Sequence, residues 1–324
     1  MTSLRNLFRV ATAVAFFGAG FGVSAQEARL RLVSFLPANA SFGIPAKRWV
    51  DEVNRRGKGI LQIDFVGPEA VPVPEQPNAV KTGVVDLHNG PPTYYRGTLI
   101  EAETLTLSDM SISELRKNGA WDYLNKLHSD KLNVTLLTGF GDGVNFHIYT
   151  TKPITSTDKV KPFAGFVLRG PPLFKVFFES LGAQVVSTAP GEVYTALERN
   201  MVQGYGWPLW GIKDLGWIKL TKVRYDPGFY NVAVNIMMNN DRRKKLTPAQ
   251  EKLLTDVSAW MDAEWPKWRA ETAAAEEKIQ KDGNVQVVNL GPDLRKRAHD
   301  AFWNELMAAS PQHIGHLVKL MRKE

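Results

Sequence analysis

The chain contains one predicted helix that is too long for a small single domain. It begins at the capping box Thr247–Gln250, where the threonine and glutamine side chains satisfy backbone N–H groups and proline takes the first helical position. Apolar residues then recur at helical spacing: Leu253, Leu254, Val257, Trp260, Met261, Trp265 and Trp268. The pattern continues to about Gln280, which corresponds to a helix of about 50 Å. We therefore expect this helix to lie across two domains, with its tryptophans packed as one apolar stripe.

The rest of the chain alternates short strands with helices, which is the pattern of an α/β fold. Short apolar or alternating runs, two of which (30–36 and 61–66) stop at proline or glycine, predict strands over residues 30–36, 61–66, 84–88, 134–138, 146–150, 164–168 and 184–187. Helical spacing predicts helices over residues 44–55, 78–83, 118–127, 173–181 and 190–200. The chain has 324 residues, of which 44% are hydrophobic, so about two domains with sizeable cores are expected.

Residues 1–25 have the pattern of a secretory signal peptide. Arg5 and Arg9 precede an apolar stretch over residues 10–23, and Val23–Ala25 places small residues where signal peptidase cuts. An apolar stretch of about 14 residues is too short to span a bilayer, which needs about 20. We expect cleavage after Ala25 and a soluble exported protein.

Charge and cysteine content exclude several classes of function. The formal net charge is +7, but the basic residues are spread along the chain without a long basic block, so a nucleic-acid partner is not expected. The chain has no cysteine, and therefore no disulfide, thiolate metal site or thiol nucleophile. An exported protein without cysteine fits the bacterial periplasm best.

The motifs of common exported enzymes are absent from the sequence. There is no GxSxG, HExxH or SxxK motif. The glycine-rich segment 139–143 lacks GxGxxG spacing and leads into a predicted strand, which argues against a nucleotide loop. His313 and His316 form the only close histidine pair, near the C-terminus, where a solvated helix face is the simpler interpretation.

One run of residues closely resembles the DctP-type solute-binding subunits of TRAP transporters, the tripartite ATP-independent periplasmic systems. The matching segments are Phe166–Pro172, Phe177–Ala183, Pro190–Leu197 and Val202–Gly204. The later segments Asp226–Tyr230 and Leu246–Gln250 and the long helix also match, so the resemblance covers nearly the whole chain after residue 25.

The resemblance implies an α/β, two-lobed periplasmic binding protein fold with hinge segments and one long helix spanning both lobes. Lobe I would comprise residues 26–146 and 232–260, and lobe II residues 147–231 and 261–324. A small organic acid would bind between the lobes and be delivered to TRAP membrane permease subunits, which use an ion gradient and no ATP. No cofactor is implied.

Arg169 is the residue for which the resemblance predicts a role most directly. It ends a predicted strand, stands beside Gly170, and matches the position of the ligand-clamping arginine of the family. A guanidinium presents parallel N–H donors that fit a carboxylate and stays charged at any relevant pH. A surface arginine or a structural ion pair is the alternative interpretation.

Trp207 follows Gly206 at a place where many family members have Asn-Pro after an acidic or amide residue. Some keto-acid-binding relatives have tryptophan here, but keep an acid before it that helps to hold a metal ion. Gly206 has no side chain to coordinate a metal, so a metal-bridged ligand is not expected. Trp207 would instead form an apolar wall for a flat or hydrophobic acid, unless its ring is buried within its own lobe.

The strand 146–150 is where sialic-acid-binding relatives carry a second arginine. Phe146 takes that place here, which argues against a dicarboxylate or a sugar acid held by two arginines. Phe146 or the adjacent His147 is expected to line the cleft, although a lone histidine is more often a structural residue.

Further candidates are asparagines and tyrosines near the ends of predicted strands. Asn39 follows the first strand, and Asn89 lies in a loop after the strand that ends at His88. Each amide offers a donor and an acceptor to a carboxylate or hydroxyl, with turn formation as the alternative role. Tyr94 and Tyr230 are included on similar grounds.

These observations together predict a periplasmic receptor that captures a monocarboxylate and closes over it, with aromatic acids and keto acids as the expected classes. Two alternatives stay open from the sequence. The chain could be a binding module that reports to a membrane sensor kinase, or an exported enzyme.

Overall fold

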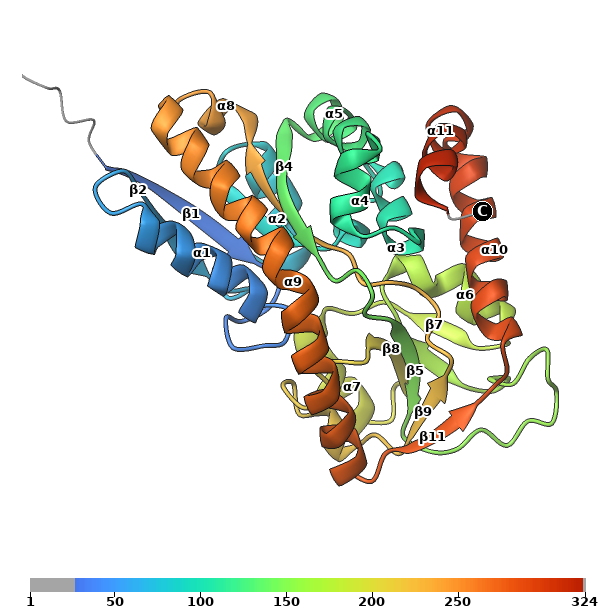
Figure 1. Cartoon of the computed structure of the whole chain (residues 1–324). Coiled ribbons are helices and arrows are strands. Elements are labelled where there is room, and N and C mark those ends of the chain that lie inside the picture. The colour runs from blue at the N-terminus through green and yellow to red at the C-terminus, as the bar shows by residue number, and fades with distance from the viewer. Residues whose placement is uncertain (1–26, 323–324) are drawn as a thin grey trace, which may run out of the picture.

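The computed structural model describes residues 27–322, and the predicted signal peptide lies outside them. The strands form two mixed sheets (Figure 1). The first has the order β2 (Leu61–Val66), β1 (Ala28–Ser34), β3 (Leu87–Gly90), β10 (Val234–Asn239) and β4 (Val134–Phe140). The second has the order β11 (Gln286–Asn289), β9 (Val223–Asp226), β5 (Phe146–Thr150), β8 (Gly204–Pro208), β6 (Val167–Arg169) and β7 (Gln184–Val186).

Helices cover both sheets, and the longest of them connects the two. The α-helices are α1 (Ile44–Arg56), α2 (Gln76–Lys81), α3 (Thr104–Leu107), α4 (Ile112–Lys117), α5 (Ala120–Leu132), α6 (Lys175–Ser180), α7 (Val193–Glu198), α8 (Asn240–Arg243), α9 (Pro248–Asp282), α10 (Asp293–Ala309) and α11 (Pro311–Met321). Short 3-10 turns are η1 (Val73–Glu75), η2 (Pro92–Tyr94), η3 (Ile100–Glu103), η4 (Pro172–Phe174), η5 (Pro190–Glu192) and η6 (Trp217–Lys219). None of the helices within residues 27–322 is long and apolar enough to cross a membrane.

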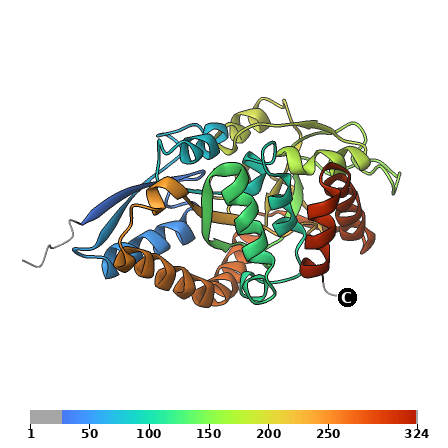
Figure 2. The ribbon, with the colours of Figure 1, turned by 90° about the horizontal axis from the view of Figure 1, so that it is seen from above.

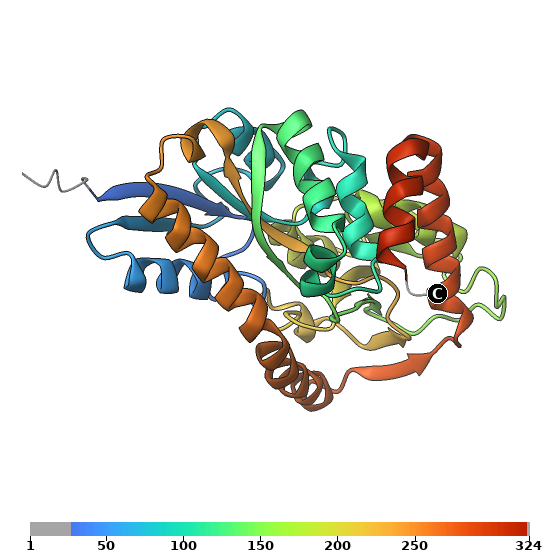
Figure 3. The same ribbon diagram turned by 45° about the horizontal axis from the view of Figure 1, so that its top comes forward.

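Helix α9 has 35 residues and runs from the first sheet to the second, as expected (Figures 1 and 3). Near its start, Ser258 Oγ accepts a hydrogen bond of 3.3 Å from the indole N–H of Trp49 on α1. Near its end, Gln280 Nε2 donates to the carbonyl of Leu209, just beyond β8, at 2.6 Å. One continuous helix is therefore attached to both halves of the molecule, and the predicted two-lobed fold with a spanning helix is confirmed.

Two chain crossings run side by side between the sheets. One leads from β4 to β5 and the other from β9 to β10, and a bridge pairs Asn145 with Asn231 between them. Asn231 Nδ2 also donates to the carbonyl of Ser108 at 2.6 Å. These paired extended segments are the natural place for a hinge, because few residues connect the halves there.

The C-terminal helices join the two halves at one end of the molecule (Figure 2). Trp303 and Leu306 of α10 pack in the core around α6, whereas Leu317 and Met321 of α11 pack in the core around α4 and α5. The lobe boundaries at residues 146, 231 and 260 stay a prediction. Helix α11, which these boundaries assign to lobe II, packs on helices α4 and α5 of the first half.

The sheets turn the carboxyl ends of their parallel strands toward the same place. Strands β1 and β3 are parallel, as are β6 and β8. The residues that follow or end these strands, including Phe35, Tyr94, Arg169 and Trp207, line one cavity. This is the usual position of a ligand site in an α/β sheet, and here two sheets supply it jointly.

We predict that Thr247→Ala destabilises the protein by about 1 kcal/mol. The hydroxyl of Thr247 accepts from the N–H of Gln250, and the Gln250 side chain accepts from the Thr247 N–H, so the variant loses half of the cap. The free energy of unfolding in urea would measure the loss. Thr255→Ala, in the exposed middle of α9, is the matched control and should be neutral within about 0.5 kcal/mol. Equal effects of the two changes would contradict the capping role.

Candidate functional site

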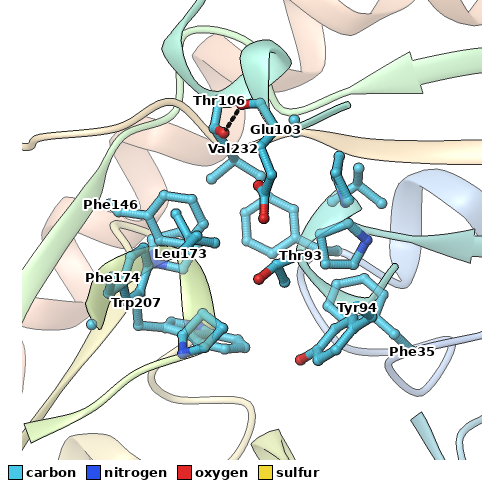
Figure 4. Close-up of a pocket in the computed structure, with 18 of the residues that line it drawn as sticks. Phe35, Thr93, Tyr94, Glu103, Thr106, Phe146, Leu173, Phe174, Trp207 and Val232 are labelled. Carbon is cyan, nitrogen blue, oxygen red and sulfur yellow. Dashed lines mark hydrogen bonds between the residues drawn. The ribbon is translucent and has the colours of Figure 1, made fainter. Parts of the chain in front are cut away.

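A small, largely apolar cavity lies between the two sheets (Figure 4). Its free volume is about 40 Å³, and its walls come from both halves of the molecule. The lining includes Tyr94, Glu103, Phe146, Arg169, Phe174 and Trp207. Among the described residues that line it, Arg169 is the only basic one and Glu103 the only acidic one. The cavity therefore combines an apolar enclosure with one group of each charge.

A wider cleft of about 800 Å³ adjoins the cavity and shares Phe35, Thr93, Tyr94 and Pro171 with it. Prolines from both halves dominate its walls: Pro37, Pro68, Pro72, Pro74, Pro171, Pro172 and Pro190. This cleft forms the mouth through which a small molecule would reach the cavity.

Arg169 ends β6 and is 1% exposed. Its Nε and Nη2 atoms both donate to the carbonyl oxygen of Thr188, just after β7, which fixes one edge of the guanidinium. Nη1 has no hydrogen-bond partner within residues 27–322. The end of the fork, formed by Nη1 and the second proton of Nη2, thus remains available, and this pair of parallel donors fits a carboxylate.

No acid in the described part of the chain forms an ion pair with Arg169. Burial lowers the pKa of Arg169 from its ordinary value, and the nearby Tyr94 and Glu192 oppose that shift. Burial raises the pKa of Tyr94, while the positive charge of Arg169 acts in the other direction. The Tyr94 hydroxyl and the guanidinium therefore face each other across the two halves. A buried cation without a carboxylate partner is costly, and such positions are candidates for anion binding.

Aromatic rings form the wall of the cavity on the side of the second sheet. Trp207 is 7% exposed, packs edge-on against Trp217 at 4.6 Å between ring centroids, and lies 5.8 Å from the guanidinium carbon of Arg169. Phe146 packs edge-on against Phe174 at 5.0 Å. Both Trp207 and Phe146 line the cavity. The wall can contact a flat ring or an alkyl group, but it offers few hydrogen bonds.

Gly206 is glycine for a steric reason. A Cβ atom at this position would lie 2.5 Å from the ring of Phe174 and 2.8 Å from that of Phe178. The aromatic rings therefore occupy the space that an acidic side chain before the tryptophan would need. Within residues 27–322, no group of three or more histidine, aspartate or glutamate side chains is placed to hold a metal ion.

The structure brings four of the predicted site residues together and leaves four outside the cavity lining. Arg169, Trp207, Phe146 and Tyr94 line the cavity. His147 points elsewhere, with Nδ1 2.8 Å from a carboxylate oxygen of Asp226. Asn39, Asn89 and Tyr230 also lie outside the cavity lining.

Asn39 is exposed and lines neither the cavity nor its mouth. Tyr230 is buried in the core of the second half, where its hydroxyl donates to the carbonyl of Ala298 at 3.0 Å. Asn89 was expected in a loop, but it belongs to β3, which continues to Gly90 because Asn89 pairs with both Ser34 and Ile236. Its amide donates to Ser34 Oγ at 2.9 Å, beneath the cavity wall.

Glu103 is the ionisable cavity residue that the sequence did not reveal. It ends η3, is fully buried, and lines the cavity from the first half of the molecule. Burial raises its pKa to about 7, against the positive charge of Arg96. Glutamate is rarely fully buried, and residues 99–105 carry no motif that marks Glu103 as an exception.

Residues 32–309 match the family model of DctP, the bacterial extracellular solute-binding protein family 7. The chain belongs to the DctP family. DctP proteins are solute-binding proteins of TRAP transporters that act outside the cytoplasm and are not enzymes.

Solved structures support the same fold at low sequence identity. An extracytoplasmic solute receptor of Bordetella pertussis with pyroglutamic acid is 16% identical, with a TM-score of 0.81 over 92% of this chain and 100% of that one. A TRAP periplasmic solute-binding protein of Desulfovibrio salexigens with orotic acid is 16% identical, with a TM-score of 0.80 over 91% of this chain and 97% of that one. A TRAP transporter solute-binding protein of Bordetella bronchiseptica with calcium and picolinate in its active site is 19% identical, with a TM-score of 0.79 over 91% of this chain and 92% of that one.

We predict that Gly206→Ala destabilises this DctP protein by about 1–3 kcal/mol, because the added methyl group overpacks the site against Phe174 and Phe178. Urea unfolding would measure the change. Gly97→Ala is the control, since no atom lies within 4 Å of a Cβ there. A neutral Gly206→Ala would mean that the rings move aside easily and that the steric argument is wrong.

Proposed function

We propose that this chain is the periplasmic receptor of a TRAP transporter that binds a small monocarboxylate through Arg169 and passes it to membrane permease subunits. The observation that carries the proposal is the buried guanidinium of Arg169, which lines the cavity and whose Nη1 group has no hydrogen-bond partner among the described residues. Family membership supports the receptor role, and the charge and position of Arg169 support an acid as its ligand.

The lining of the cavity supports a monocarboxylate of modest size. Arg169 is the only basic residue among the described lining residues, so a second carboxylate would find no second cation there. Trp207, Phe146 and Phe174 surround the position beside it with apolar surface. Aromatic and keto acids fit this combination. The related structures named above contain pyroglutamate, orotate and picolinate, each a ring that carries one carboxyl group.

Closure of the two halves over the ligand would follow from contacts that already bridge the cleft. Ser41, in the loop after β1, donates from its N–H and its hydroxyl to Asp214 of the second half, at 2.7 and 2.6 Å. The ligand would add a bridge between Arg169 and groups of the first half such as Tyr94. Because it makes both contacts only when the halves meet, the acid binds the closed form better and shifts the population toward it.

Arg169→Met should weaken binding of the best acid by at least about 10- to 100-fold, because it removes charge-assisted hydrogen bonds of about 1.5–3 kcal/mol. A thermal-shift screen of the protein from residue 26 onward against pyroglutamate, orotate, picolinate and other organic acids would find the ligand, and calorimetry would measure affinity. The melting temperature without ligand should change little, because the loss of the hydrogen bonds to the Thr188 carbonyl offsets the relief of an unpaired buried charge. Arg29→Met, at an exposed arginine, is the control. Unchanged affinity in Arg169→Met would contradict the proposal.

Trp207→Leu should weaken aromatic acids more than aliphatic ones, by about 3- to 10-fold, because the loss of an aromatic contact is worth about 0.5–1.5 kcal/mol. Calorimetry would test this by comparing the affinities for the aromatic acids orotate and picolinate with those for the non-aromatic acids pyroglutamate and lactate. Trp260→Leu, on α9 away from the cavity, should leave both classes unchanged. An equal loss for both classes in Trp207→Leu would exclude a stacking wall.

A further inference from the structure

We propose that Glu103 is the second polar anchor of the cavity and that it selects acids carrying an N–H or O–H group over hydrocarbon acids of the same size. This inference rests on the proposed function, in that it takes the cavity to bind an organic acid through Arg169. It names a protein partner for the part of the ligand that lies away from its carboxylate, where the apolar lining otherwise offers few hydrogen-bonding groups.

The geometry of Glu103 is that of a group aimed at a ligand. Figure 4 shows its carboxyl projecting into the space bordered by Phe146, Thr93 and Tyr94. Neither carboxyl oxygen has a hydrogen-bond partner of good geometry within residues 27–322, although the side chain is fully buried; the side chains of Thr93 and Thr106 lie near enough to lower its pKa. The backbone is held in place, since the Thr106 hydroxyl donates to the carbonyl oxygen of Glu103 itself. A buried carboxyl without hydrogen bonds is costly unless something else satisfies it.

The charged neighbours of Glu103 do not satisfy it. Arg96 approaches only to 3.6 Å and donates instead to Glu305 of α10 at 2.7 Å, so that second acid competes for the same cation. The hydroxyls of Tyr95 and Tyr230, whose pKa values the charge of Glu103 affects, already bond to Asn235 and to the carbonyl of Ala298. Tyr94 and Arg169 line the same cavity as Glu103.

A ligand with a carboxylate and a polar hydrogen would satisfy both buried groups at once. Its carboxylate would lie against Arg169, and its N–H or O–H would donate to a carboxyl oxygen of Glu103. A hydrocarbon acid would leave Glu103 without a partner after the cavity has closed. Sites with a buried polar group discriminate strongly against ligands that cannot pair with it.

The same arrangement makes binding depend on pH. With its pKa raised to about 7 by burial, Glu103 is largely neutral below that pH and can accept the ligand's hydrogen bond without repelling its carboxylate. Above pH 7 it ionises and faces a second anion in a dry cavity. Affinity should therefore fall as the pH rises from 6 to 8.

Two probes of the same ring size test the selectivity: pyroglutamate, which has an N–H group, and cyclopentanecarboxylate, which has none. The wild type should prefer the member with the polar hydrogen by about 10- to 100-fold. Glu103→Leu should abolish or reverse this preference, and Glu103→Gln should keep the preference but lose its pH dependence. If the cavity is too narrow for rings, lactate, which has an O–H group, and propionate, which has none, form a smaller pair of probes.

Stability without ligand gives a second, independent test. Below about pH 4.5 the carboxyl is protonated in both folded and unfolded chains, but between pH 4.5 and 7 the unfolded chain loses the proton first, so folding becomes less favourable as pH rises. The melting temperature of Glu103→Gln should therefore exceed that of the wild type increasingly up to pH 7. Subtracting the two curves removes other titrating groups such as Asp142.

The outcomes separate this inference from the proposed function. Acid binding that requires Arg169 but shows the same probe ratio in wild type and Glu103→Leu would overturn the role of Glu103 alone. Parallel pH–stability curves for wild type and Glu103→Gln would overturn it too. Failure of every acid to bind the wild type would overturn the proposed function together with the selectivity, whereas the stability curves would still report whether Glu103 is unpaired.

Discussion

The burial of one arginine without an acidic partner is the constraint around which this molecule is organised. Arg169 is at the carboxyl end of β6, and the carbonyl of Thr188 fixes one edge of its guanidinium. A charge removed from water in this way costs several kcal/mol unless an anion joins it. The two sheets, the paired crossings and helix α9 together hold the two halves so that the remaining donors face an enclosed space and not solvent.

Much of the fold could be predicted from the sequence because its signals are local. The capping box and the apolar stripe determine where α9 begins and how far it continues, and the observed helix Pro248–Asp282 agrees with the expected end near Gln280. Strands β2 and β5 have the predicted bounds, since each alternates cleanly and ends at a clear break. The family motif around Arg169 also placed that residue correctly at the end of a strand.

Other features depend on partners that no local pattern specifies. Strand β3 lies three residues later at its start than predicted, at Leu87, because pairing with β1 and β10 selects its register. Glu103 is an acidic residue in a segment that mixes polar and apolar residues, and it is buried because η3 packs against α5 and α10. The sequence showed that Gly206 replaces the possible metal ligand of other family members. The structure shows why a larger residue does not fit there, because the ring of Phe174 occupies the space that a side chain would need.

The prolines around the mouth have a consequence for the thermodynamics of capture. Loops that close over a small molecule commonly lose backbone freedom, and that loss reduces affinity. Here Pro37, Pro72 and Pro171 line the mouth of the cavity, and the proline ring restricts the backbone φ angle at each of these positions before a ligand binds. The entrance is thus preorganised, and more of the interaction energy between protein and acid remains for drawing the two halves together.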